Sequence, residues 1–392
     1  MLEMLRTLVV GLGRAGAGLH LPVLAKARAR QDRCFAPEPV VGYDQDPAAR
    51  ARQAGAGRHL VASLAAARRE LDPERTVVHV CTPPVARVEV VSELLRLGFR
   101  KLLLEKPLAA GPDDLARLLA SLRQEGLRPD LRTAVVAPWL ASTLTDRLAA
   151  LVAGRGAEET EGHRSAVGAA AGALDTLGAL RQISVVQDKP RFQRSLATSG
   201  HPTAFDVEVP HALGVLLRLA GDAEVVSADC TDLRVDGRCL PRLGGATLAL
   251  AHRGGVRSVV RSDLTSPVRE RRITLLFEHG TAVGHYPADS YDRYAQLRLT
   301  AADSATERRE VFRDEALTEF MLRAYAYFGG DGPCPATVEQ QARVVELLGR
   351  AKELAAAPGA AASPSAAPSV AAAAAAAAAE IPLQGRELTG VR

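Results

Sequence analysis

Short apolar runs recur along the first third of the chain, and each ends in a polar or glycine-containing turn. The runs are Thr7–Val10, Val40–Tyr43, Val77–Val80, Lys101–Leu104 and Thr133–Val136. The stretches between them, such as Ala48–Ala54 and Val88–Leu97, have helical periodicity. Strands that alternate with helices predict an α/β domain whose parallel sheet is doubly wound, with helices on both faces. We place this domain at residues 1–137.

The pattern changes after residue 180. The runs Gln182–Val186, Ala246–Leu250 and Arg272–Leu276 predict strands joined by glycine-containing turns. They indicate an α+β domain over residues 138–356, with an open-faced, largely antiparallel mixed sheet and a helix packed on one face. The amphipathic segment Thr337–Leu354 is predicted to close this domain.

Two segments lack any apolar periodicity. Residues 154–178 are rich in Gly, Ala and Glu, and we predict a loop there. Residues 357–392 are rich in Ala, Pro and Ser, so they bury too little apolar surface to fold and are predicted to form a low-complexity, disordered tail.

Charge and cysteine usage exclude several classes of protein. The 49 Lys and Arg residues against 45 Asp and Glu give a net charge of +4, and the basic residues are scattered, which argues against a nucleic-acid partner. The five cysteines form no CxxC pair and no Cys/His cluster with zinc spacing, so no metal is expected. The N-terminus shows no signal-peptide pattern, and no stretch outside the alanine tract has the roughly 18 apolar residues that a membrane span needs. We therefore expect a cytoplasmic protein with no membrane partner.

The first strand runs directly into a GxGxxG turn, which spans residues 11–16. In a dinucleotide-binding turn, Gly11 would allow the tight bend, Gly13 would let the backbone approach a pyrophosphate, and Gly16 would let helix and strand pack closely. A helix over residues 17–26 would then present unpaired N–H groups to the phosphates. Gly11, Gly13, Arg14, Ala15 and Gly16 are thus candidate cofactor-binding residues.

The second predicted strand ends in Asp44. A carboxylate there normally accepts hydrogen bonds from the adenosine ribose and repels a 2′-phosphate, which favours NAD over NADP. Arg50 is close enough in sequence to leave NADP open. The alternative is that Asp44 serves only as an acid at a helix N-terminus before Pro47.

Two further motifs carry a family resemblance. The segment from Val77 to Pro84 contains a Thr-Pro-Pro turn, and Leu104 to Leu108 contains Glu-Lys-Pro. With the glycine turn, in this order and spacing, they resemble the glucose–fructose oxidoreductase / inositol dehydrogenase / rhizopine catabolism (Gfo/Idh/MocA) family, over residues 1–355.

This resemblance implies a Rossmann domain, a second sheet that carries the substrate pocket, and usually a homo-oligomer such as a dimer or tetramer. It also implies that Thr82, Pro83 and Glu105 lie at the cofactor and that Lys106 lies beside the nicotinamide and the substrate hydroxyl. An ammonium group there would stabilise the alkoxide that develops as hydride leaves.

The family's remaining catalytic pair is an Asp and a His one helical turn apart. The spacing from His211 to Gly221 matches the family, which identifies His211 as the family histidine. Asp206 lies five residues before it instead of four. Either Asp206 keeps its role across a bulge or Glu208 faces His211 as an i, i+3 neighbour. We prefer Asp206; the alternative is that Asp206 caps a helix and His211 lies at its N-terminus.

The sequence thus predicts an NAD(P)-dependent dehydrogenase or reductase acting on a CH–OH group of a sugar, cyclitol or aminosugar derivative. The high Ala, Arg and Leu content is typical of high-GC bacteria, which is compatible with a role in antibiotic or other specialised metabolism. An NAD-dependent glycoside hydrolase and a non-catalytic NAD-sensing regulator are the alternatives. The carboxylates of Asp206 and Glu208 would suit an amine-bearing substrate. The alternative is that their interactions with His211 use both carboxylates fully.

Trp139, the single tryptophan, either forms an apolar wall of the pocket or packs in the core.

Overall fold

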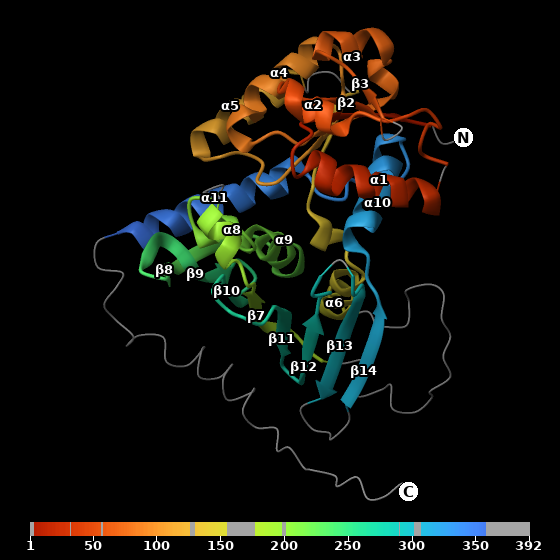
Figure 1. Cartoon of the computed structure of the whole chain (residues 1–392). Helices are drawn as coiled ribbons and strands as arrows, with labels where there is room; N and C mark the ends of the chain where they lie inside the picture. Colours follow the sequence, from red (N-terminus) through yellow and green to blue (C-terminus); the bar gives the residue numbers. More distant parts are fainter. Residues whose placement is uncertain are drawn as a thin grey trace, which may run out of the picture.

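Two sheets, one parallel and one mixed, organise the chain (Figure 1). The computed structural model describes residues 4–31, 33–55, 58–125, 130–154, 177–197, 201–289, 291–301 and 307–357. The predicted loop at 154–178 and the predicted tail at 357–392 lie outside the described residues, apart from their end positions.

The first sheet has six parallel strands in the order β3-β2-β1-β4-β5-β6. The strands are β1 (Arg6–Val10), β2 (Val41–Tyr43), β3 (His59–Leu60), β4 (Thr76–Val80), β5 (Lys101–Leu104) and β6 (Arg132–Val135). This is the order of a Rossmann fold, in which the direction of winding reverses between β1 and β4. The five predicted strands are confirmed with shifts of at most one residue at either end. β3 was missed because two residues carry no alternation to detect.

Helices cover both faces of this sheet because successive side chains of each strand point to opposite sides. Leu8 and Val10 of β1 pack under α3 (Leu64–Glu70), α4 (Arg87–Arg96) and α5 (Pro112–Glu125). Val9 faces the other side, where α1 (Leu21–Arg30) and α10 (Ala316–Phe328) lie together (Figure 1). The short helix α2 (Pro47–Gln53) follows β2.

The second sheet has eight strands in the order β14-β13-β12-β11-β7-β10-β9-β8. They are β7 (Leu180–Asp188), β8 (Ala223–Val235), β9 (Arg238–His252), β10 (Arg257–Asp263), β11 (Glu270–Phe277), β12 (Gly280–His285), β13 (Tyr294–Ala301) and β14 (Glu307–Arg313). Only β7 and β10 pair in parallel, so the sheet is mixed and largely antiparallel, as predicted. α6 (Thr143–Val152) and α9 (Val209–Ala220) pack on one face, and no described element covers the other.

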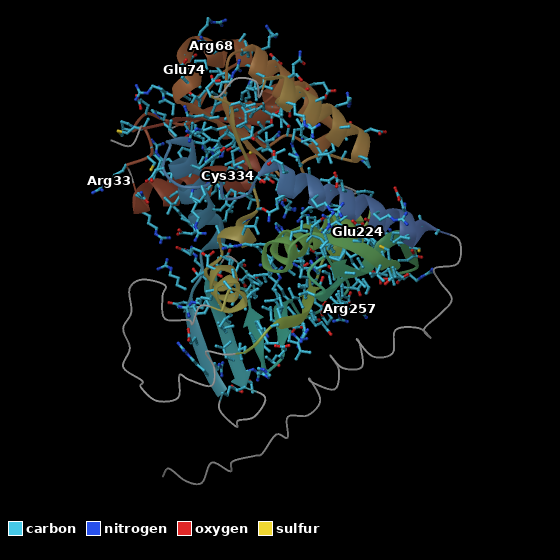
Figure 2. All side chains as sticks on the ribbon, turned by 180° about the vertical axis from the view of Figure 1, so that it is seen from behind. Arg33, Arg68, Glu74, Glu224, Arg257 and Cys334 are labelled. Carbon is cyan, nitrogen blue, oxygen red and sulfur yellow. The ribbon has the colours of Figure 1, made fainter. Side chains whose placement is uncertain are left out.

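The last two helices lie at the junction of the two sheets. α11 (Val338–Ala356) packs against β8 of the second sheet and against α9, which covers that sheet. It also packs against β6 of the first sheet and against α5, which covers it. The segment before it is tied to β6, because Val135 N–H donates to Ala336 O at 3.1 Å and Cys334 Sγ lies 3.5 Å from Thr133 O (Figure 2). The helix predicted to close the second domain thus contacts both. Within the described residues, no helix is long and apolar enough to cross a membrane.

Two buried hydrogen bonds of one tyrosine attach α10 to the first sheet. The Tyr325 hydroxyl lies 2.5 Å from Thr7 Oγ1 on β1 and 3.0 Å from His79 Nε2 on β4. All three side chains are buried. Burial, with the neighbouring His20, holds the pKa of His79 well below its usual value, so His79 is neutral. A helix from the end of the chain is therefore bonded to the central strands at its start.

We expect Tyr325→Phe to lower the free energy of unfolding by about 1–3 kcal/mol, because it leaves buried polar partners on Thr7 and His79 unsatisfied. Urea or guanidinium unfolding of the full chain measures this. Tyr291→Phe is the matched control, since Tyr291 is 94% exposed. Equal stabilities of the two variants would contradict a stabilising role for the Tyr325 hydroxyl.

Candidate functional site

The glycine turn lies at the carboxyl ends of β1 and β4, where the winding reverses. Gly11 has φ +92° and its N–H donates to Tyr43 O at 2.8 Å. A Cβ on Gly16 would lie 1.9 Å from Gly11 O, so only glycine allows this approach. A Cβ on Gly13 would meet nothing within 4 Å, which leaves open space over the turn. Gly11 thus forms the tight bend and Gly16 the close approach, while the binding of a pyrophosphate at Gly13 stays a prediction; Arg14 is exposed.

The predicted helix after this turn begins as a single π turn, η1 (Gly16–His20), before α1. This turn brings the His20 side chain into the interior, where it is fully buried. The sequence pattern carried no signal for that histidine.

Asp44 lies against the glycine turn. Its Oδ2 accepts from Leu12 N–H at 2.7 Å and its Oδ1 accepts from Asp46 N–H at 2.9 Å. Asp46, not Asp44, caps α2 by accepting from Ala48 N–H. Asp44 therefore does more than provide an acid at a helix terminus: it joins the end of β2 to the glycine turn. Arg50 donates to Asp44 O at 2.5 Å from the same side.

These residues fit a dinucleotide. Gly13 leaves room for phosphates, Asp44 stands at the end of β2, and the Thr82 Oγ1 atom is buried without a hydrogen-bond partner. A buried hydroxyl lacking a partner is costly, so it points to a ligand group at the turn after β4. Gly11, Gly13, Asp44 and Thr82 would hold such a cofactor.

A chain of buried hydrogen bonds leads from the interior to Lys106. Glu105 Oε1 lies 2.8 Å from His20 Nε2, and Glu105 Oε2 accepts from the Lys106 backbone N–H at 2.9 Å. His20 Nδ1 lies 2.8 Å from His79 Nδ1. Burial by itself would raise the pKa of Glu105, but the hydrogen bond and charge of His20, with nearby cations, hold it below its usual value.

The ionised carboxylate fixes the first bond of this chain, because Glu105 can only accept, so His20 Nε2–H donates to it. In the bonds from His20 to His79 and from His79 to Tyr325, the tautomers of the two histidines determine which atom donates. At the other end, Glu105 accepts from the backbone N–H of Lys106 and so orients this residue.

Arg87 clamps the two turns that face the glycine loop. Its guanidinium donates to Thr82 O at 2.8 Å, to Leu108 O at 3.1 Å and to Pro107 O, and the side chain is 1% exposed. The Thr-Pro-Pro turn and the Glu-Lys-Pro turn are therefore held in one position relative to each other.

Lys106 and His211 line one pocket, which is the juxtaposition that the resemblance implied. The other lining residues are Val136, Ala137, Trp139, Leu140, Pro210, Gly214 and Gln341. Trp139 stacks between the rings of His211, at 5.7 Å between centroids, and Tyr286, at 4.2 Å. Trp139 thus forms a wall of the pocket and is also buried. Tyr286 is buried as well.

The His211 imidazole is neutral. Burial, reinforced by the positive charge of Lys106 and only partly opposed by Glu208, lowers its pKa to about 3. A neutral ring beside a lysine can accept a proton from a bound hydroxyl group.

The hydrogen bonds of Asp206 go to residues other than His211. Asp206 Oδ2 accepts from Thr203 N–H at 3.1 Å and from Thr203 Oγ1 at 2.7 Å, and Oδ1 pairs with Lys352 at 2.5 Å. Asp206 thus forms the capping box of the short helix Ala204–Asp206, as in the alternative given above. Its role as the partner of His211 stays a prediction.

Glu208 lies on the His211 side instead. It is buried, pairs with Lys189, and lies 3.7 Å from Arg271 Nη2. Burial would raise its pKa, but the charges of Lys189 and Arg271 and the hydrogen bond from Lys189 are among the causes that lower it to about 2. Both carboxylates at 206 and 208 are therefore already matched to lysines of this chain.

The sequence missed four site residues of the second domain. Lys189 and Arg191 follow β7, and Arg271 lies on the adjacent strand β11. Burial, and then the charges of Lys106 and Arg191, lower the pKa of His201 to about 4. Lone basic residues after a strand give no pattern, so only the fold gathers them.

Comparisons with known proteins agree with this geometry. Residues 5–130 match the model of the oxidoreductase family GFO_IDH_MocA, described as having an NAD-binding Rossmann fold. A search of curated proteins finds no match.

Several solved structures share the whole fold. A dehydrogenase from Bordetella pertussis, solved with NADH and UDP-GlcNAcA, has a TM-score of 0.65 at 19% identity, over 90% of this chain and 96% of its own. A 3-ketoreductase from Actinomadura kijaniata, solved as a variant with NADP and TDP-benzene, has 0.66 at 17%, over 90% and 98%. UDP-N-acetylglucosamine 3-dehydrogenase from Acidithiobacillus ferrooxidans has 0.63 at 16%, over 90% and 97%.

At such identities these structures establish the fold alone. The family model matches the sequence of residues 5–130, about a third of the chain, so this N-terminal part is similar to the Gfo/Idh/MocA oxidoreductase family, described as having an NAD-binding Rossmann fold.

Proposed function

We propose that this oxidoreductase transfers hydride between a nicotinamide cofactor and a secondary alcohol or ketone of a sugar, cyclitol or aminosugar derivative. The observation that carries the proposal is that Lys106, from the Glu-Lys-Pro turn, and His211 line one pocket. The similar dehydrogenase solved with UDP-GlcNAcA and the similar UDP-N-acetylglucosamine 3-dehydrogenase support a sugar or aminosugar derivative.

The cofactor, when bound, supplies or accepts the hydride, and the chain's own groups handle the proton. Lys106 provides a cation at the oxygen of the reacting carbon, where negative charge develops. His211, neutral and buried, receives a hydroxyl proton on oxidation and returns it on reduction. Trp139 stacks on His211 and limits its rotation.

We expect Lys106→Ala to reduce kcat by at least about a hundredfold while the NADH dissociation constant stays within about threefold, because the ammonium acts on the reacting oxygen. His211→Ala should reduce kcat by about a hundred- to ten-thousandfold. The double variant should lose less than the product of the single losses, since the two groups act together. Steady-state kinetics at 340 nm with a sugar panel and NADH fluorescence titration measure this.

Lys26→Ala, an exposed lysine on α1, is the matched control and should retain wild-type kcat. A nearly wild-type His211→Ala would show that the base lies elsewhere. Sugar release without net NADH turnover would instead indicate the glycoside hydrolase alternative.

We expect Glu208→Gln to reduce kcat/KM and shift its pH profile, because Glu208 supplies the negative charge that supports protonation of His211. Asp206→Asn should leave kcat within about threefold and lower the free energy of unfolding by about 1–3 kcal/mol, since it weakens the Thr203 cap and the Lys352 pair. Kinetics and denaturant unfolding of both variants separate the two roles. The reverse pattern would restore Asp206 as the partner of the histidine.

We expect NADH to bind at least about tenfold more tightly than NADPH, because the Asp44 carboxylate would repel a 2′-phosphate at the end of β2. Asp44→Asn should reduce the ratio of the NADPH dissociation constant to the NADH dissociation constant. Fluorescence titration of both cofactors measures it. A preference for NADPH would contradict the assignment and identify Arg50, which lies beside Asp44, as the phosphate ligand.

A further inference from the structure

Three cations of the second domain gather beside the catalytic pocket. Lys189 and Arg191 lie in the segment between β7 and α8 (Phe192–Ala197), and Arg271 lies on β11. Lys189 N–H donates to Asp263 O at 2.8 Å and Arg191 N–H donates to Leu264 O at 3.1 Å. The backbone that carries two of the cations is therefore held against the end of β10.

These cations carry more charge than their carboxylate neutralises. Glu208 pairs with Lys189 and lies 3.7 Å from Arg271, and its charge also acts on Arg191. The single carboxylate of Glu208 thus interacts with three cations. The positive charge of Lys106, in the first domain, also acts on Lys189. A site with excess positive charge attracts an anion.

Arg191 is the strongest sign of a missing ligand. Its side chain is 4% exposed, and its Nε and Nη1 atoms are buried with no hydrogen-bond partner among the described residues. Gln187, the penultimate residue of β7 and paired in register with Arg271, has both amide atoms buried without partners among the described residues. Leaving a buried guanidinium unsatisfied is expensive, whereas an oxygen of a phosphate or carboxylate against one edge of it would accept a charge-assisted hydrogen bond.

We infer that Arg191, with Lys189 and Arg271, binds an anionic group of the substrate, a phosphate or a carboxylate, while Lys106 and His211 face the carbon that is oxidised or reduced. This inference rests on the proposed function, because it assigns the substrate of the same pocket. It separates sugar phosphates, nucleotide-linked sugars and sugar acids from neutral sugars and cyclitols. The second possible source of the anion is the cofactor's own phosphates, since the Arg14 charge in the glycine turn also acts on Arg191.

Paired probes on the NADH-loaded full chain test this by calorimetry. UDP against uridine isolates phosphate, and D-glucuronate against D-glucose isolates carboxylate. We expect the anion of at least one pair to bind at least tenfold more tightly than its neutral partner, and this preference to weaken as NaCl is raised. Arg191→Gln should weaken the anion about ten- to a hundredfold, as expected for lost charge-assisted hydrogen bonds, with the NADH dissociation constant within about twofold.

Arg257→Gln is the matched control, an exposed arginine on β10 of the same sheet (Figure 2), and should bind both probes as wild type does. The inference is overturned if neither pair discriminates in the wild-type chain, if Arg191→Gln binds the anion unchanged, or if it weakens NADH as much as the anion, which would assign Arg191 to the cofactor. Should Arg191→Gln fail to fold, Lys189→Gln and the salt dependence of the wild-type chain decide instead.

Binding of the probes does not require turnover, so this inference and the proposed reaction fail separately. Lys106→Ala, which should lose turnover, is expected to keep the preference for the anion. A wild-type chain that discriminates the anions yet transfers no hydride would contradict the proposed reaction and leave the anion site standing.

Discussion

The buried carboxylate of Glu105 connects the packed interior of the first domain to the candidate active site. One oxygen accepts from His20 and the other from the backbone of Lys106. Behind His20, the hydrogen bonds continue through His79 to Tyr325 on the penultimate helix. An ionised carboxylate in this position stays buried only because each of its neighbours is a donor or a cation, so its surroundings must form together.

The position of Lys106 therefore depends on segments that are far apart in the sequence. Tyr325 attaches α10 to β1 and β4, and α11 follows at the junction of the two sheets. Arg87 adds the second constraint by holding the two turns on either side of Lys106. The reacting groups come from different domains, and this junction is what holds them at a common pocket.

The pocket has an electrostatic asymmetry. In the first domain, the positive charge of Lys106 lies near the negative charge of Glu105. In the second domain, the single negative charge of Glu208 interacts with three cations. Burial, with the same excess of positive charge, keeps His201 and His211 neutral. The proposed proton transfer through His211 and the proposed binding of an anionic substrate would both depend on this arrangement of charges.

The sequence by itself determined the features that depend on local order. The alternation of apolar runs predicted the parallel sheet, the glycine spacing predicted the turn geometry, and the spacing to Gly221 singled out His211, which lines the pocket with Lys106. Each is readable because strand period, backbone freedom and helix pitch act over a few residues.

Only the tertiary structure decided which side chains meet. Asp206 and Glu208 are two residues apart, yet one turns to Lys352 and the other to Lys189, which a linear spacing cannot distinguish. The His20–His79–Tyr325 chain and the three cations around Glu208 join residues separated by tens to hundreds of positions. Contacts of this kind follow from how sheets and helices pack, and burial then sets the charge state of each group.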